Sequence, residues 1–336
     1  MSPSPAAGHP GERRIALIHH SSRSESSVDI GVGVAAAAAA FGFELVTFDP
    51  DFDQARREQC VADAIALRPD LIVATVVAPH LVPDQVAEAA ALGIPWIGVG
   101  ALQAPFPGVV AQVAPDETAL TALLDRWLLD RLLADGGDGE VEIGAWIAPV
   151  LGEGLIARDR QRAVDLAAAP RIRERVTHEI ALDDLERDIR ASTERALDRH
   201  PRIRGLWQTC EPCVTTQALT LDVLGLRGED RPLIAGFYSN RTTRRLVRDG
   251  RVGGLVQVDT RVQGLVAVDL AVEHWTSGRP WPEAGTDPTA AYGVPLGRPW
   301  VIDRDNVGLT VDELRPPGPD PVAFFATRWA ERFGLS

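Results

Sequence analysis

The stretch RPDLIVATVVAPHLVPDQVAEAAALGIPWIGVG, residues 68–100, holds the pattern that decides the fold. It contains LIVATVV (71–77), an uninterrupted apolar run rich in β-branched residues, which is typical of a strand buried on both faces. A helical segment at about 83–92 follows, and then a second apolar run, IPWIGVG (94–100). Strand, helix and strand in this order predict a parallel sheet that is covered by helices.

The same alternation continues on both sides of this stretch. Upstream, strands are predicted at 13–20 and 43–49, with helices through the Ala run 35–40 and over 53–67. Downstream, the pattern restarts after a helix at 116–134. The strands predicted there are 141–148, 175–180, 203–209, 232–238 and 252–258. The helices are 157–168, 183–199, 213–224 and 241–250, and a long helix at 261–277 closes the pattern. The 336 residues therefore predict two α/β lobes of similar size, since a domain takes about 150 residues.

The net charge of the chain is −13, and Arg supplies all 34 of its basic residues. This balance argues against a nucleic-acid partner, because no basic face is available to neutralise phosphates. No apolar run reaches the ~18 residues that a membrane span requires. The start MSPSPAAGHPGERR lacks the cationic and apolar parts of a secretory signal. From the sequence as written we expect a cytoplasmic protein with a disordered tail at 1–12.

The motif GVGVAA (31–36), with Asp49 at the end of the second strand, imitates a dinucleotide-binding fingerprint. That motif needs its first Gly directly after the strand, so that a helix N-terminus meets the pyrophosphate. Here ten residues separate His20 from Gly31. We therefore prefer an interpretation in which the glycines lie within a helix and allow close packing.

Cys210-Glu-Pro-Cys213 lies where a strand passes into a helix, as thioredoxin-like dithiols do. We favour a turn of small residues at this point, and a local disulfide between the two cysteines remains an alternative. A zinc site would need two further ligands nearby, and the pair His19-His20 has no supporting carboxylate–histidine cluster. The sequence also has no G-x-S-x-G elbow, no H-E-x-x-H and no P-loop. We accordingly expect no enzyme activity, no cofactor and no metal.

Several segments together resemble the ribose-binding and lactose-repressor-like group of type I periplasmic binding proteins, over roughly residues 13–310. The resemblance rests on GVAAAAAAFGFEL (33–45), RPDLIVATVVAPH (68–80), ARDRQRAVDLAAA (157–169), LIAGFYSN (233–240) and DGRVGGLVQVDTRVQGLVAVDL (249–270). It implies two Rossmann-like lobes joined by a multi-strand hinge, with a small polar ligand between the carboxyl ends of the two sheets. It also implies lobes formed by 13–112 plus 259–282 and by 113–258 plus 283–336.

The function that the resemblance implies is solute binding for an ABC-type importer, by a monomer outside the cytoplasm. The ligand would be a sugar, a polyol or a similar molecule, and the importer's membrane subunits would be partners. The alternative is a cytoplasmic ligand sensor that resembles a repressor core without its DNA-binding headpiece. The family's aromatic residues after strand one are replaced by Ser26 and Ser27, so an ordinary pentose or hexose is not the expected ligand.

Candidate ligand-binding residues follow from the rule that loops after the carboxyl ends of parallel strands face the ligand. They are His20, Ser21, Ser22, Ser26, Ser27, His80, Glu153, Arg158, Thr209, Cys210, Glu211, Tyr238, Asn240 and Gln257. The resemblance maps Arg158 and Gln257 onto sugar-contacting residues, and a guanidinium offers five donors in a fixed fork. Tyr238 is expected to supply a stacking face. The alternative for Arg158 is an ion pair with Glu153 or Asp159 on its own helix.

Overall fold

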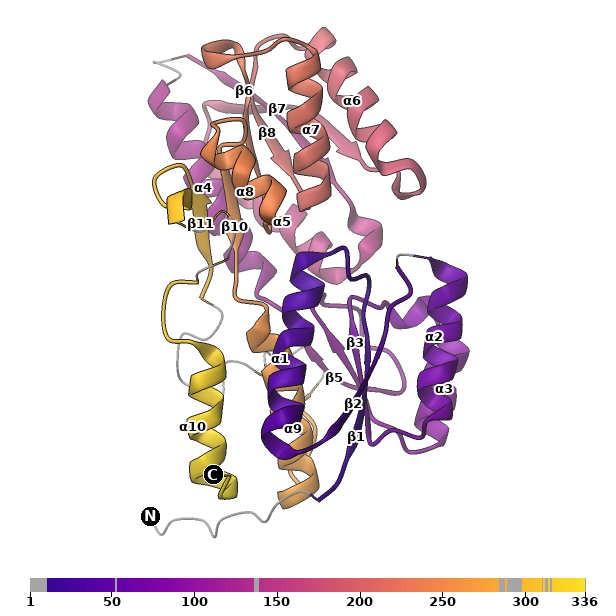
Figure 1. The fold of residues 1–336 in the computed structure, drawn as a ribbon. Helices are drawn as coiled ribbons and strands as arrows, with labels where there is room; N and C mark the ends of the chain where they lie inside the picture. The colour runs from indigo at the N-terminus through magenta and orange to yellow at the C-terminus, as the bar shows by residue number, and fades with distance from the viewer. Residues whose placement is uncertain are drawn as a thin grey trace. The chain divides into compact units, whose positions relative to one another are not determined.

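The computed structural model describes residues 11–51, 53–135, 139–283, 288, 298–309, 311, 314 and 316–335. The predicted tail at 1–12 lies outside these ranges except for its last two residues. The chain divides into two α/β units, each built on its own sheet (Figure 1). Lobe 1 comprises Met1–Pro115, Asp259–Arg298 and Pro317–Ser336, and lobe 2 comprises Asp116–Val258 and Pro299–Pro316.

The sheet of lobe 1 has the strand order β2-β1-β3-β4-β5, and all its strands are parallel. Its strands are β1 (Arg14–Ile18), β2 (Glu44–Phe48), β3 (Leu71–Thr75), β4 (Trp96–Val99) and β5 (Val109–Val113). The strand predicted at 71–77 is β3, and each of its residues is buried, as expected for a strand covered on both faces. The sequence analysis missed β5.

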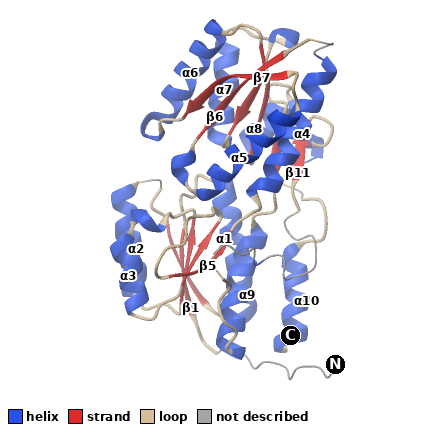
Figure 2. Cartoon of the chain, turned by 180° about the vertical axis from the view of Figure 1, so that it is seen from behind, coloured by secondary structure: helices blue, strands red, loops and turns tan. Residues whose placement is uncertain are grey.

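Helices cover both faces of this sheet (Figure 2). On one face lie α2 (Gln54–Ala66) and α3 (Pro83–Ala91), and the short 3₁₀ helix η1 (Pro79–Leu81) follows β3. On the other lie α1 (Glu25–Phe41), α9 (Arg261–Ser277) and α10 (Pro321–Phe333). None of the helices in the described ranges is long and apolar enough to cross a bilayer.

The glycines of GVGVAA lie inside α1, as predicted, and the dinucleotide interpretation is excluded by that position. A Cβ on Gly33 would lie 2.1 Å from the Arg261 carbonyl oxygen, and one on Gly264 would lie 2.2 Å from the Ile30 carbonyl oxygen. The backbones of α1 and α9 therefore cross in direct contact, which only glycine permits at these two positions.

The sheet of lobe 2 has the order β11-β10-β9-β8-β6-β7, parallel except for β11. Its strands are β6 (Val141–Ile147), β7 (Ile172–Glu179), β8 (Ile203–Gln208), β9 (Leu233–Phe237), β10 (Gly254–Gln257) and β11 (Trp300–Asp303). Its helices are α4 (Glu117–Asp135), α5 (Glu153–Ala168), α6 (Leu185–Arg199), α7 (Glu211–Val223) and α8 (Arg241–Arg248). The strand expected at 175–180 begins three residues earlier, at Ile172.

The prediction that residues 283–336 belong to the second lobe is wrong for the C-terminal helix. Only Pro299–Pro316, with β11, belong to lobe 2. Helix α10 instead inserts Phe325, Trp329 and Phe333 into the apolar core of lobe 1, where Trp329 contacts Phe41. The indole N–H of Trp329 also donates to the buried Asp269 carboxylate of α9 at 2.7 Å.

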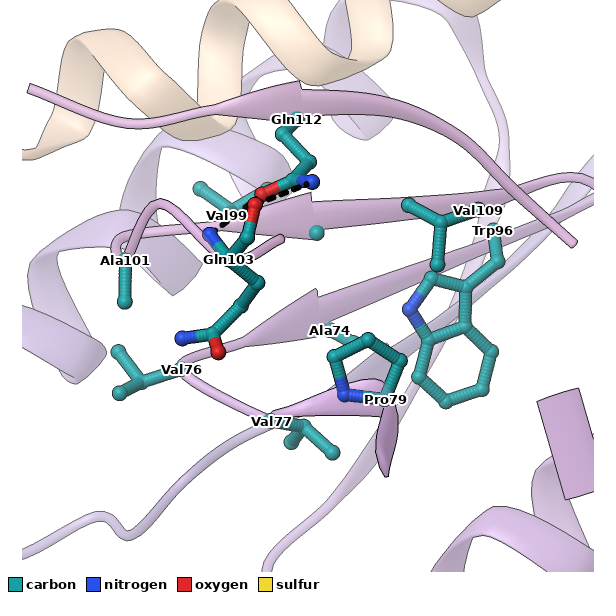
Figure 3. Close-up of a pocket in the computed structure, with 11 residues that line it drawn as sticks. Ala74, Val76, Val77, Pro79, Trp96, Val99, Ala101, Gln103, Val109 and Gln112 are labelled. Carbon is teal, nitrogen blue, oxygen red and sulfur yellow. Dashed lines mark hydrogen bonds between the residues drawn. The ribbon is translucent and has the colours of Figure 1, made fainter. Parts of the chain in front are cut away.

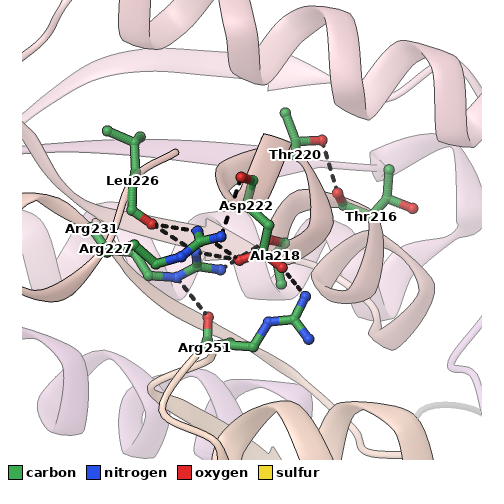
Figure 4. A network of polar contacts seen from close by, with 8 residues as sticks. All are labelled: Thr216, Ala218, Thr220, Asp222, Leu226, Arg227, Arg231 and Arg251. Carbon is green, nitrogen blue, oxygen red and sulfur yellow. Dashed lines mark hydrogen bonds and ion pairs between the residues drawn. The ribbon is translucent and has the colours of Figure 1, made fainter. Parts of the chain in front are cut away.

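Two carboxyl groups of lobe 2, the half-buried Asp222 and the buried Asp125, have side-chain partners away from the strand ends. Asp222, near the end of α7, accepts hydrogen bonds from Arg227 and Arg231 and contacts Arg251 (Figure 4). Asp125 of α4 accepts a hydrogen bond from the indole of Trp207 at 2.8 Å. Burial raises the pKa of the Asp125 carboxyl to about 8, so this side chain is protonated at neutral pH.

Candidate functional site

In a parallel sheet the carboxyl ends of all strands meet at one edge, and polar side chains gather there in lobe 2. Arg158 projects from α5, which follows β6, and only 3% of this residue is exposed. Its Nε donates to the Glu117 carboxylate at 2.7 Å, and a terminal nitrogen donates to the Thr209 carbonyl at 2.6 Å. Its ion-pair partner is thus Glu117 of α4, and the alternative pairing with Glu153 or Asp159 is wrong.

The carboxylate of Glu117 holds Tyr238 as well as Arg158. The Tyr238 hydroxyl donates to Glu117 Oε1 at 3.1 Å. Burial, and then the Glu117 charge, raises the pKa of the Tyr238 phenol well above its usual value, so Tyr238 stays a neutral donor. The Arg158 guanidinium carbon lies 3.9 Å from the centre of the Phe237 ring and 5.3 Å from that of Tyr238. We call Glu117, Arg158, Phe237 and Tyr238 the Arg158 cluster.

Electrostatics keep the Arg158 guanidinium charged. Burial, the largest single effect, lowers the pKa of Arg158, but its neighbours, foremost the Glu117 carboxylate, together raise that pKa overall. Within the part of the chain that the structure describes, two of the five guanidinium N–H groups of Arg158 bond to Glu117 and Thr209, so three donors remain for a further acceptor. The cluster can therefore bind vicinal hydroxyls or a carboxylate through a positioned fork.

Three of the remaining candidates follow β8 and begin α7. Thr209 is buried, and its carbonyl oxygen accepts the bond from Arg158. Cys210 is half-buried, and its Sγ lies 2.6 Å from that of Cys213. Glu211 is buried at the first position of α7. Glu153 is half-buried at the first position of α5.

Gln257 and Asn240 are placed at this edge, but their side chains bond to the backbone. Gln257 Oε1 accepts from the Ser239 N–H at 2.7 Å, and its Nε2 donates to the Val258 carbonyl at 2.8 Å. The Asn240 side chain accepts from the Thr243 N–H at 2.9 Å and caps α8. These bonds explain both residues without a ligand, so their contact with one stays a prediction.

In lobe 1 the loop after β1 is held by internal hydrogen bonds. Ser27 is buried and bonds to His19 and Thr75, and Ser21 is buried and donates to Asp51 at 3.1 Å. Ser26 and Ser27 were nominated as residues of the loop after the first strand, but they belong to the first turn of α1. Ser26 is half-buried and Ser22 is exposed.

The two histidines among the candidates differ in their surroundings. Burial, with a smaller effect of the Arg57 charge, lowers the pKa of His20 to about 4, so its imidazole is neutral at pH 7. His80 is exposed on η1 after β3. The described residues contain no group of three or more His, Cys, Asp or Glu side chains that could hold a metal ion.

Two cavities lie in lobe 1. One is a space of about 10 Å³, lined by residues including Val76, Trp96 and Gln103, which holds a single water at most (Figure 3). Gln112 closes it by bonding to both backbone groups of Gln103. A second cavity, of about 490 Å³, is lined by residues that precede β1, β3, β4 and β5 and by others that include Trp275 of α9. It therefore lies at the amino edge of the sheet.

Sequence reasoning missed Glu117, the residue that organises the Arg158 cluster. The rule used was that each strand nominates the residues after its carboxyl end. Because β5 (VVAQV, 109–113) was not recognised as a strand, the residues that follow it were never nominated. The alternation of Val109, Ala111 and Val113 with other residues was the signal that could have revealed this strand.

Comparisons with known proteins agree with this architecture. Residues 15–280 match the model of a family described as periplasmic binding protein domain. A glucose-galactose binding protein from Geobacillus stearothermophilus is 17% identical, with a TM-score of 0.71 over 88% of this chain and 99% of its own. An ABC transporter solute-binding protein from Agrobacterium vitis with bound α-D-tagatopyranose is 19% identical, with a TM-score of 0.72 over 90% and 100%. A periplasmic ribose ABC transporter protein from Conexibacter woesei is 16% identical, with a TM-score of 0.72 over 90% and 95%. No curated protein matches the sequence.

Proposed function

Because this chain belongs to the periplasmic binding protein domain family, we propose that it is a solute-binding protein that delivers a small polar ligand to the membrane subunits of an ABC-type importer. It acts outside the cytoplasm in this proposal and catalyses no reaction. The ligand is a sugar or a polyol, as in the similar proteins described with bound tagatose, allose or glycerol.

The observation that carries the proposal is the Arg158 cluster at the carboxyl edge of lobe 2. A guanidinium that is oriented by Glu117 and by the Thr209 carbonyl keeps donors in a fixed direction before any ligand arrives. Such preorganisation strengthens the binding of ligand groups that accept hydrogen bonds, such as hydroxyls, because the protein loses little further freedom on binding. The Tyr238 hydroxyl is already occupied by Glu117, so we assign Tyr238 to positioning of that carboxylate.

The absence of an aromatic platform from the start of α1 narrows the ligand class. Ser26 and Ser27 stand there, and Ser27 is buried with protein partners. A ligand recognised mainly by hydrogen bonds, such as a polyol or a small sugar acid, fits this part of lobe 1 better than a hexose that needs a stacking ring.

The test begins with a thermal-shift screen against sugars, polyols and sugar acids, followed by calorimetry with each compound that stabilises the protein. At a hundred times its Kd a ligand stabilises the folded state by about 2.7 kcal/mol. Arg158→Ala should then weaken binding at least tenfold, since a hydrogen bond to a charged group contributes about 1.5–3 kcal/mol. Arg160→Ala, an exposed residue on the same helix, is the matched control.

Each variant is checked for folding by circular dichroism before the titration. Tyr238→Phe, which keeps the ring and the ion pair, provides a milder perturbation of the same cluster. A screen without any stabilising compound, or an Arg158→Ala protein that binds like the wild type, would contradict the proposal.

A further inference from the structure

The pair Cys210 and Cys213 is a chemically reactive feature of this edge that solute binding alone does not explain. Cys210 directly precedes α7, and Cys213 is the third residue of that helix. Their Sγ atoms lie 2.6 Å apart, whereas a disulfide has a length of about 2.04 Å. A movement of roughly half an ångström would join them. The remaining cysteine of the chain, Cys60, lies on α2 in lobe 1.

We propose that Cys210 and Cys213 are a reversible dithiol–disulfide pair, and that formation of the disulfide increases the affinity of the Arg158 cluster for its solute. The oxidant is a small-molecule disulfide such as oxidised glutathione. The disulfide itself stands on the geometry of the two thiols, while its effect on affinity rests on the proposed function.

The different burial of the two sulfurs sets the order of the exchange. Cys210 is half-buried and can meet an oxidant, whereas Cys213 is fully buried. Its hydrogen bond with Cys210, together with burial, raises the pKa of the Cys213 thiol well above its usual value, so Cys213 keeps its proton while Cys210 reacts. Cys210 is therefore the first nucleophile, because it is the sulfur that an oxidant can reach.

The exchange is balanced in two steps. The Cys210 thiolate attacks one sulfur of the oxidant, the oxidant's S–S bond breaks, and one thiolate leaves and takes up a proton. Cys213 then loses its proton and attacks Cys210 Sγ, the mixed disulfide breaks, and the second thiolate leaves. The protein gives up two electrons and two protons, and the oxidant becomes two thiols.

The link to the site is the peptide segment between β8 and α7. The Thr209 carbonyl, adjacent to Cys210, accepts the hydrogen bond that orients Arg158 at 2.6 Å. A bond from Cys210 to the first turn of α7 restricts this segment, and a restricted site loses less entropy on binding.

The first experiment counts thiols in the full-length protein after treatment with oxidised glutathione and unfolding. We expect one free thiol in the oxidised protein and three after reduction, and Cys60→Ser should give none and two. Cys213→Ser should carry a single glutathione on Cys210, as seen by mass spectrometry. Three thiols after oxidation would overturn the proposal.

The second experiment compares the Kd of oxidised and reduced protein for a compound found in the screen. We expect at least threefold tighter binding by the oxidised form, and no such difference in Cys213→Ser, while Cys60→Ser should respond like the wild type. Equal affinities would overturn the coupling. If the screen yields no ligand, the proposed function fails, but the thiol count still decides whether the pair forms.

Discussion

Removing the Glu117 carboxylate should destabilise lobe 2 by an amount that follows from the contacts of the Arg158 cluster. Glu117 and Arg158 have side chains that are only 4% and 3% exposed. In Glu117→Ala the guanidinium stays buried without its counter-charge, which costs about 3–5 kcal/mol. The Tyr238 hydroxyl loses its acceptor, which adds about 1 kcal/mol. The bond to Thr209 remains and keeps the total near the lower end, at about 4 kcal/mol.

The assay is urea unfolding monitored by circular dichroism, with wild type, Glu117→Ala, Glu117→Leu, Arg158→Met and the double variant Glu117→Leu/Arg158→Met. Replacing both partners by apolar side chains leaves no buried charge, so the double variant should lie within about 1–2 kcal/mol of wild type. The double-mutant cycle then measures the coupling between the two side chains. Glu153→Ala, at the half-buried start of α5, is the control and should change stability by less than about 0.5 kcal/mol.

A Glu117→Ala protein within about 1 kcal/mol of wild type would refute this reasoning, because the ion pair would then be absent or solvated. A double variant as unstable as the sum of the single ones would refute it as well. That result would show that the two side chains act independently.

Three further perturbations test the fold. The pKa of Asp125 is about 8 in the folded protein and near 3.9 in the unfolded chain. The contribution of Asp125 to the free energy of unfolding is therefore complete below about pH 4. It falls by at most about 1.4 kcal/mol per pH unit as the pH rises towards 8. Asp125→Asn should therefore gain stability relative to wild type between pH 5 and 8 in urea unfolding, and parallel curves would contradict the assignment. Asp222→Ala removes the carboxylate that pairs with Arg231, whose side chain is 7% exposed, so the free energy of unfolding should fall by about 3–5 kcal/mol. A fall below about 1 kcal/mol would mean that water replaces the Asp222 carboxylate. Gly33→Ala should lower the melting temperature by several degrees, whereas Gly308→Ala, where a Cβ meets nothing within 4 Å, should not; equal melting temperatures would contradict the close helix contact.

The fold could be predicted because buried parallel strands have an unmistakable sequence pattern. Runs such as 71–77 are apolar throughout, and every residue of β3 is buried in the structure. The elements that escaped prediction lack this pattern. Strand β11 is short and adds antiparallel at the sheet edge. Helix α10 packs Phe325, Trp329 and Phe333 into the core of lobe 1, and its Arg328 pairs with Glu273 of α9. The spacing of apolar residues within such a helix does not predict which lobe the helix will cover.

The candidate site was predicted in part, because strand ends can be read from the sequence while side-chain partners cannot. The rule of strand ends brought Arg158, Thr209 and Tyr238 into one list, and the structure joins them through hydrogen bonds. The partner Glu117 lies 41 positions from Arg158, and nothing in the spacing of two charged residues that far apart predicts an ion pair. Gln257 was found by resemblance, but its backbone bonds to Ser239 and Val258 depend on how two neighbouring strands end.

Backbone strain at the carboxyl edges of the two sheets is the property that is hardest to predict from the sequence. Val76, after β3, has φ +54°, and Tyr238, after β9, has φ +62°, although neither is a glycine. A β-branched or bulky residue in this region costs about 1–3 kcal/mol and persists only where its surroundings hold it. Both are held by an extra strand-like bond of 2.8 Å, from Val76 N–H to the Val99 carbonyl and from Tyr238 N–H to the Val256 carbonyl. The bond at Tyr238 sets the direction in which the phenol leaves the sheet and so brings its hydroxyl to Glu117. The strained residue Tyr238 is thus held by the neighbouring strand β10 and contacts Glu117, which in turn orients Arg158.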